Sequence, residues 1–337
     1  MNTVDRVDQF QRRHRILGYP LAVIYKYFDD AGGYLAALLT YYAFLSLFPV
    51  LLLLATVLSL VLRNNPDLQA RILDSAISQI PVIGNQLKDP KSLSGGPVGV
   101  VIGASVAIYG ALGVGNALQH AMNVIWSVRR NERPNPILSR VRSLLLIVTA
   151  GLAAVATTAL SIFNAAISDW GAWTRVLILL VTIALNTGIV YLCFRIGISR
   201  AQRRHQFPGA LLAAIGWHFL QLYGLTYVAR VINRASAINS VFAFILGLLA
   251  FIYLTAVLVV ICAEINVVSA QRLWPRALLT PFTDSVHLTE ADKRVYDSQA
   301  KSMASKGFER VRVEFGPSPK PPLPTREGSG SAEGDDG

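Results

Sequence analysis

The sequence is poor in charge, since only 15% of its 337 residues are charged and 53% are hydrophobic. Soluble domains carry about 25% charged residues, so this shortage favours a protein that spans a membrane. Cysteine is almost absent as well. The two that occur, Cys193 and Cys262, both lie inside apolar runs. A disulfide framework and a cysteine-based zinc site are therefore excluded.

Catalytic motifs are also missing. The five histidines are scattered, and no HxxxH, HxH or HxxEH spacing brings two of them together. The sequence has no P-loop, no GxSxG motif and no dinucleotide-binding fingerprint. An acidic group near the C-terminus, with His287, Glu290 and Asp292, has the residue types that hold a divalent ion, but such a group is usually a solvated helix face. We therefore expect no enzyme, no metal and no cofactor.

Long apolar runs dominate what is present. The hydrocarbon core of a bilayer is about 30 Å thick and a helix rises about 1.5 Å per residue, so a span needs about 20 apolar residues. Segments of that length occur at 34–62, 98–118, 143–168, 176–194, 210–231 and 241–260. The predicted fold is all-α: a polytopic membrane protein with a bundle of six transmembrane helices.

These spans divide the chain into three parts. Residues 1–33 mix charged and apolar side chains, which predicts an amphipathic cytoplasmic arm that turns into the first span at Gly32 and Gly33. The membrane domain occupies 34–275 and includes an outer amphipathic loop at 63–97. Residues 276–337 are expected to form a cytoplasmic tail that is disordered from about residue 316, where Pro, Gly, Ser and acidic residues prevail.

The positive charges orient the bundle. The chain has 31 Lys and Arg and a net charge of +11, and most of these residues lie in alternate segments, beginning with the N-terminal one. The positive-inside rule therefore places both termini in the cytoplasm. Because topology and the anionic inner leaflet account for the basic composition, we expect no nucleic-acid partner.

An acidic residue toward the cytoplasmic end of the sixth predicted span is a candidate for function. Ionisable residues at the bilayer centre cost about 2.5–3.5 kcal/mol, so an intramembrane acid is a functional candidate. Glu264 lies at the cytoplasmic end of the sixth span. It either pairs with an inner-face arginine, such as Arg142 or Arg195, and locks the bundle, or it takes part in coupling or substrate contact.

Two further features mark individual spans. His218 and Gln221 lie three residues apart in the fifth span near Trp217 and Tyr223, so they either line a polar cavity or form hydrogen bonds between helices. Pro49 removes a backbone donor from the first span and is expected to kink it.

The second span carries a ridge of small residues on one helix face. They recur at every fourth position, at Gly99, Gly103, Ala107, Ala111 and Gly115. Such a ridge lets another backbone approach closely. It predicts either packing inside the bundle or the contact of a homo-oligomer.

Three short motifs lie on the first, fifth and sixth spans: YYAFLSLFP at Tyr41–Pro49, FPGA at Phe207–Ala210 and AEIN at Ala263–Asn266. Together they resemble the YihY/BrkB family of bacterial inner-membrane proteins, and within it the YhjD branch. The resemblance covers roughly 21–276, and Cys262 stands where that family has glycine. It makes further candidates of Tyr42, Ser46, Pro208, Gly209 and Asn266.

The resemblance implies a location in the bacterial inner membrane and a role in envelope integrity, with links to the export of lipid or lipopolysaccharide. Some members carry the label ribonuclease BN. A metal-dependent nuclease of that kind needs a clustered HxHxDH-type ligand set, which this sequence lacks. The label is therefore discounted.

Three hypotheses remain. The first is a transporter, or a transport accessory, for a lipid or lipid-linked envelope component, with inner-face arginines that hold anionic headgroups. The second is a scaffold that transports nothing, in which Glu264 is structural. The third, which we favour least, is a membrane-bound hydrolase built around His287, Glu290 and Asp292.

Overall fold

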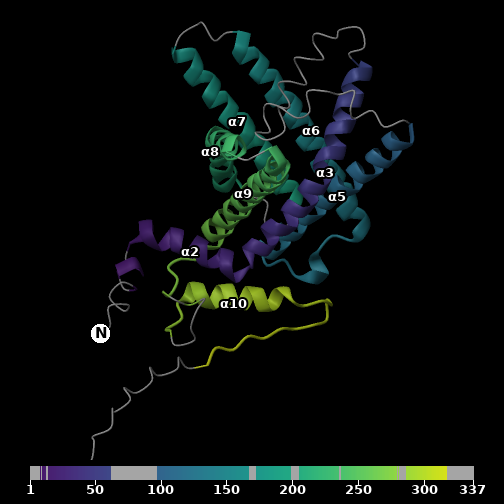
Figure 1. Cartoon of the computed structure of the whole chain (residues 1–337). Helices are drawn as coiled ribbons and strands as arrows, with labels where there is room; N and C mark the ends of the chain where they lie inside the picture. Colours follow the sequence, from purple (N-terminus) through teal and green to yellow (C-terminus); the bar gives the residue numbers. More distant parts are fainter. Residues whose placement is uncertain are drawn as a thin grey trace, which may run out of the picture.

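The computed structural model describes residues 8, 10–12, 14–61, 97–166, 172–198, 205–234, 237–278, 280 and 286–316. Every regular element in these ranges is a helix (Figure 1), which confirms the all-α fold. The predicted outer loop at 63–97, except Pro97, lies outside the described residues, as does the tail from 317 onward.

Six long helices correspond one to one to the predicted spans. With 26 to 35 residues each and a rise of about 1.5 Å per residue, all are longer than the roughly 30 Å of a bilayer core. They are α3 (Gly32–Val61), α5 (Pro97–Ile125), α6 (Pro136–Ala166), α7 (Ala172–Gly197), α8 (Phe207–Arg234) and α9 (Ala237–Gln271).

Three of these helices contain a described stretch that is long and apolar enough to cross a membrane: Pro136–Leu160, Val176–Gly197 and Ile245–Gln271. A shorter apolar stretch, Gly32–Leu47, lies in α3. Many large apolar side chains of α6 and α7 point outward, including Leu152, Val155 and Leu180, as expected for helices that face lipid. The chain is a helical membrane protein, and the count of six spans stays a prediction.

The long helices pack in a closed circuit. Each long helix contacts the next along the chain, and α9 also contacts α3. The last of the long helices therefore lies beside the first of them (Figure 1). The polar face between α5 and α6 adds hydrogen bonds. Gln119 donates to the Ser143 hydroxyl at 2.9 Å, and Ser143 donates to Asn116 at 3.0 Å. Hydrogen bonds between helices of this kind fix the position of one span against another.

Small residues of α5 let α3 approach closely. A Cβ added to Gly113 would lie 2.1 Å from the Tyr42 ring, and one added to Gly110 would lie 2.6 Å from the Ser46 Cβ. The two candidates from the first motif thus pack on α5. The helix α3 continues past Pro49 to Val61, and the kink at that proline stays a prediction.

The predicted small-residue ridge serves packing inside the chain where its surroundings are described. Ala107 is buried, and a Cβ on Gly115 would lie 2.7 Å from the Ser143 Cβ on α6. The surroundings of Gly99 and Gly103 lie outside the described residues. The homo-oligomer contact stays a prediction.

Two shorter helices, α2 (Arg15–Asp29) and α10 (Glu290–Ser302), lie across one end of the bundle (Figure 1). We call this end the base. The helix α2 buries Ala22, Val23 and Tyr25 and exposes Ile24 and Phe28. The turn into α3 has its positive φ at Ala31 (53°), one residue before the predicted glycine pair, while a Cβ on Gly32 would meet the Tyr27 ring.

Candidate functional site

The second and third motifs meet at the start of α8. The backbone N–H of Gly209 donates to the Asn266 side-chain oxygen at 2.7 Å, and the Asn266 amide donates to Gln206 at 3.2 Å. The first N–H groups of a helix have no partner within it. Asn266, on α9, therefore caps α8 from a distant part of the chain, and Pro208 occupies the exposed first turn, where proline is tolerated.

Gly209 is required by this contact. An added Cβ would lie 2.0 Å from the carbonyl oxygen of Cys262 and 2.6 Å from the Asn266 amide nitrogen. The backbones of α8 and α9 thus approach closely at Gly209 even though Cys262 stands where the YihY/BrkB family is expected to have glycine. The missing Cβ that permits it belongs to α8.

Glu264 lies at the centre of the base and is completely buried. The cation within ion-pair distance is Lys26 of α2, whose Nζ lies 3.8 Å from the carboxylate, instead of Arg142 or Arg195. Arg142 is half-buried on α6, and Arg195 is exposed on α7. The expectation of an arginine partner is thus corrected, because the N-terminal arm folds back under the bundle and supplies the positive charge.

Lys26 is shared by several acceptors. Its ammonium forms an ion pair with Asp30 and donates to the Ile125 carbonyl at 3.1 Å. Burial lowers the pKa of Lys26, but Glu264, Asp30 and Asp29 raise it by more. The ammonium therefore keeps its charge and joins α2 to α5 and α9.

Arg276 forms the second half of this buried charge cluster. Its guanidinium is completely buried and donates to Asp29 at 2.8 Å and to Asp292. It also lies over the rings of Tyr25 and Tyr296, with 6.0 and 5.7 Å to the centroids. Because these partners belong to α2 and α10, Arg276 fastens the C-terminal helix to the N-terminal one.

Asp292 has two structural tasks. Its carboxylate binds Arg276 and accepts from the backbone N–H of Thr289 at 2.9 Å, while the Thr289 hydroxyl accepts from the Asp292 N–H at 3.1 Å. The pair forms a capping box at the start of α10. The described residues hold no group of three or more potential metal ligands, so His287, Glu290 and Asp292 are not assembled as an ion site.

Sequence reasoning missed the base cluster, although two local signals existed. Lys26 and Asp30 have the i,i+4 spacing of a helical ion pair, and Thr289 precedes Asp292 by the three residues of a capping box. The link between these pairs and Glu264 has no local signal, because it spans most of the chain.

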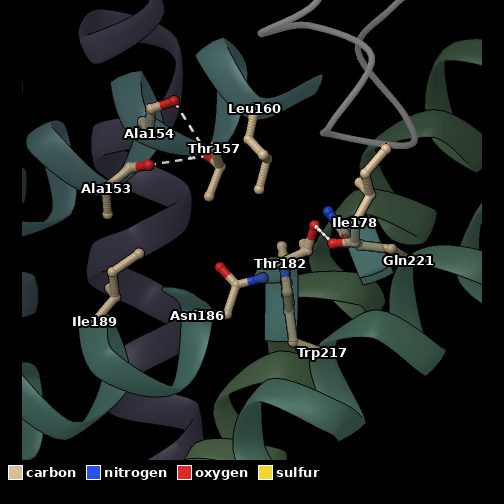
Figure 2. A pocket seen from close by; sticks show the side chains of 10 residues that line it. All are labelled: Ala153, Ala154, Thr157, Leu160, Ile178, Thr182, Asn186, Ile189, Trp217 and Gln221. Atoms are coloured by element: carbon tan, nitrogen blue, oxygen red, sulfur yellow. Dashed lines mark hydrogen bonds between the residues drawn. The ribbon is translucent and has the colours of Figure 1, made fainter. Parts of the chain in front are cut away.

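A separate cavity of about 230 Å³ lies between α6, α7 and α8. Gln221 and Trp217 line it, as anticipated, whereas His218 does not and Tyr223 is exposed elsewhere. Neither Glu264 nor Arg142 or Arg195 lines it. Figure 2 shows the described residues that line it: Ala153, Ala154, Thr157, Leu160, Ile178, Thr182, Asn186, Ile189, Trp217 and Gln221.

The polar side chains of the cavity differ in whether they already form hydrogen bonds within the protein. The hydroxyls of Thr157 and Thr182 donate to carbonyls of their own helices at 2.9 and 2.8 Å. The amides of Asn186 and Gln221 form no side-chain hydrogen bond with any residue that the structure describes, and Figure 2 shows Asn186 pointing into the middle of the lining. Two amides are thus free to bind a polar group.

Comparison with known proteins identifies relatives along most of the chain. "Inner membrane protein YhjD" of Escherichia coli (strain K12) is 24% identical over 78% of this chain and 84% of its own. An uncharacterized protein of Dickeya dadantii is 27% identical over 74% of this chain and 84% of its own. A Bacillus subtilis protein, YfkH, whose name includes the description ribonuclease-like, is 25% identical over 73% and 93%.

No solved structure matches the chain. The model of the family described as virulence factor BrkB matches residues 23–281. That range includes all three motifs, the cavity and both buried cations of the base. The chain is a membrane protein that belongs to the virulence factor BrkB family.

Proposed function

We propose that the protein is a multi-pass inner-membrane protein, with both termini in the cytoplasm, that moves or helps to move a lipid or lipid-linked envelope component. The observation that carries this proposal is the cavity between α6, α7 and α8. It is partly open and places two free amides among apolar helices. An amphiphile that crosses a bilayer needs such polar groups for its headgroup and apolar walls for its tail.

The depth of the cavity supports the proposal. Thr157, Asn186 and Gln221 each lie near the middle of a predicted span, at 143–168, 176–194 and 210–231. Transporters commonly bind their substrates near the bilayer midplane, where helices of different parts of the fold meet. A polar group at that depth is costly unless it has a partner, and such groups mark substrate pathways.

A lipid-flipping assay in proteoliposomes tests the proposal. The purified protein is compared with Asn186→Leu, Gln221→Leu and the control Thr149→Val, whose hydroxyl bonds only its own helix at Leu145. We expect the two amide variants to slow headgroup movement and the control to match the native protein. Movement no faster than in protein-free vesicles, for every envelope lipid tried, would refute the proposal.

A scaffold without transport is the second candidate, and the base favours it. Glu264 is buried in a packed cluster whose described partners are protein groups, and it does not line the cavity. This burial supports a structural role for Glu264, as that candidate requires. A stoichiometric partner recovered by crosslinking, together with unchanged lipid distribution in a deletion strain, would establish the scaffold and displace the transporter.

The inner-face arginines support contact with anionic lipid headgroups. Arg129, Arg130, Arg140 and Arg195 are exposed, and a phosphate binds guanidinium groups strongly. Association with anionic vesicles should weaken when these residues are changed to Gln. Because exposed charges are screened, it should also weaken as salt rises.

The proposed orientation has its own test. Single cysteines at Ser78 and Ser199, which lie outside the described residues, are introduced into a background without Cys193 and Cys262. In intact cells an impermeant thiol reagent should modify the cysteine at position 78 and leave the one at 199 unmodified. Modification at 199 would reverse the orientation.

A further inference from the structure

We infer that the cavity between α6, α7 and α8 binds an uncharged part of a lipid, bearing hydroxyl or carbonyl groups, and does not bind a phosphate. The inference rests on the proposed lipid-handling role and specifies the chemistry of its ligand. The residues that carry it are Asn186 and Gln221, with Thr157, Thr182 and Trp217 around them (Figure 2).

A phosphate bound in this cavity would need a cation beside it. None of the described lining residues is charged. On α7 the nearest basic residue towards the cytoplasmic end is Arg195, nine residues beyond Asn186, which is about 13 Å along the helix axis. On α6, Arg142 lies still farther from Thr157. A phosphate placed here would be buried without a counter-charge, at a cost of several kcal/mol.

The same holds for α8. No Lys, Arg, Asp or Glu occurs from Phe207 to Ala229. The titratable residues of that stretch nearest to Gln221 are Tyr223, which is exposed, and His218, which is half-buried, and neither lines the cavity. Among the described residues, the lining that the three helices supply therefore holds no group that compensates an anion. At the other end of α7, the side chain of Arg175 lies outside the described residues.

The hydrogen-bonding groups of the cavity match those of an uncharged polar ligand. Each side-chain amide offers an acceptor oxygen and two N–H donors. A hydroxyl both donates and accepts hydrogen bonds, and an ester carbonyl accepts one from an N–H. The amides of Asn186 and Gln221 can therefore satisfy either group. The Thr182 hydroxyl donates to its own helix and has lone pairs that can accept a further bond.

The size of the cavity and its apolar walls also fit such a ligand. The cavity of about 230 Å³ is several times the roughly 30 Å³ that a water molecule occupies in the liquid, so it admits a unit of several heavy atoms. Leu160, Ile178, Ile189 and the Trp217 ring supply apolar walls. A glycerol backbone with its ester groups and a sugar ring both combine apolar faces with uncharged oxygens.

Photolabelling of the full-length protein in lipid nanodiscs tests the inference. Three photoactivatable probes are compared: a diacylglycerol, a glucosyl diacylglycerol and a phosphatidic acid. We expect one or both neutral probes to label α6, α7 or α8 more than phosphatidic acid does. A diacylglycerol preference would assign the glycerol backbone, and a glucosyl preference the sugar. Equal or stronger labelling by phosphatidic acid would overturn the inference.

Variants sharpen the test. Asn186→Leu and Gln221→Leu should each weaken neutral-probe binding about three- to tenfold, the effect of one lost hydrogen bond, while Thr149→Val should leave it unchanged. Gln221→Lys supplies the missing cation and should shift the preference towards phosphatidic acid. If both leucine variants fold normally and are still labelled by the neutral probes as strongly as the native protein, the assignment of the binding site to this cavity is refuted.

Because labelling measures binding and not transport, a failure of this inference can be distinguished from a failure of the proposed transport function. Neutral labelling that depends on Asn186 and Gln221, without any lipid movement in proteoliposomes, would refute the proposed transport and keep the inference. Movement of an anionic lipid that survives both leucine variants would refute the inference and keep the proposed function.

Discussion

The backbone nitrogen of Gly209 lies 2.7 Å from the side-chain oxygen of Asn266, so the start of α8 is held by a residue of α9. Two motifs that are separate in the sequence thus form one structural unit. The unit has no space for a side chain at position 209, because an added Cβ would lie 2.0 Å from the Cys262 carbonyl.

Gly209→Ala should therefore destabilise the protein by about 1–3 kcal/mol, the usual cost of overpacking. The measurement is the apparent Tm in detergent. Gly188→Ala on α7 is the matched control, since a Cβ there meets no described atom within 4 Å, and replacement of a mid-helix glycine by alanine is neutral or stabilising. Equal Tm values for the two variants would contradict the close approach.

Lys26→Met should be more damaging. It leaves Glu264 and Asp30 buried without their cation, and removal of one partner from a buried ion pair costs about 3–5 kcal/mol. Adding Glu264→Gln should recover part of the loss, because one of the stranded charges is then removed. Thermal unfolding of the single and double variants measures the coupling between Lys26 and Glu264.

The exposed Arg195 provides the control for this experiment. Arg195→Gln should change the Tm little, and its combination with Glu264→Gln should show no coupling. Coupling between Arg195 and Glu264, in place of coupling with Lys26, would restore the arginine partner expected from the sequence.

Asp292→Asn should loosen α10 from the base. The variant loses an ionic partner of Arg276 and weakens the capping box, so hydrogen exchange should accelerate over 290–302 and leave α5–α9 unchanged. Asp297→Asn is the control on the same helix. Its partner Lys301 lies 2.8 Å away in a half-exposed pair, and such pairs contribute about 0–1 kcal/mol. Similar exchange in both variants would show that Arg276 does not fasten α10.

Asp29 should give the base a pH dependence. Burial raises the pKa of Asp29 above its ordinary 3.8, and Arg276 offsets this only in part. The folded protein therefore holds a proton at Asp29 in a pH range where the unfolded chain has lost it. In that range, upward from about pH 4, the contribution of Asp29 to stability falls as pH rises.

The measurement compares Tm against pH for the native protein and Asp29→Asn. The asparagine variant cannot ionise at position 29, so the difference between the two curves should favour the native protein more at acidic pH than at neutral pH. A constant difference across the range would show that Asp29 keeps its ordinary pKa in the fold.

The sequence was sufficient to predict the long helices, because the length of an apolar run is itself the signal for a span. For His218 and Gln221 it left two alternatives open, a polar cavity or hydrogen bonds between helices, and the structure places Gln221 in a cavity lining without His218. Asn186 on α7 is one of several polar residues in spans, and no sequence pattern distinguishes an amide facing a cavity from one bonded to another helix. That distinction depends on how α6, α7 and α8 pack.

The partner of Glu264 could not be predicted from the sequence, for another reason. Positive charges near membrane ends are all explained by topology, so no single one stands out as a partner. Lys26 is the partner because α2 folds under the bundle, a path that depends on the turn at Ala31 and on the fit of Tyr27 against Gly32.

The closure of the base also sets an order of assembly. Gln11 donates to the carbonyl of Arg276, 265 residues away, at 2.6 Å, and Lys26 meets Glu264. As a ribosome synthesises the chain, Lys26 and Asp30 emerge long before α9 and α10 supply their partners. The N-terminal helix therefore completes its contacts with the bundle only after the last span has been made, and a chain truncated before α9 leaves Lys26 without Glu264 and Asp29 without Arg276.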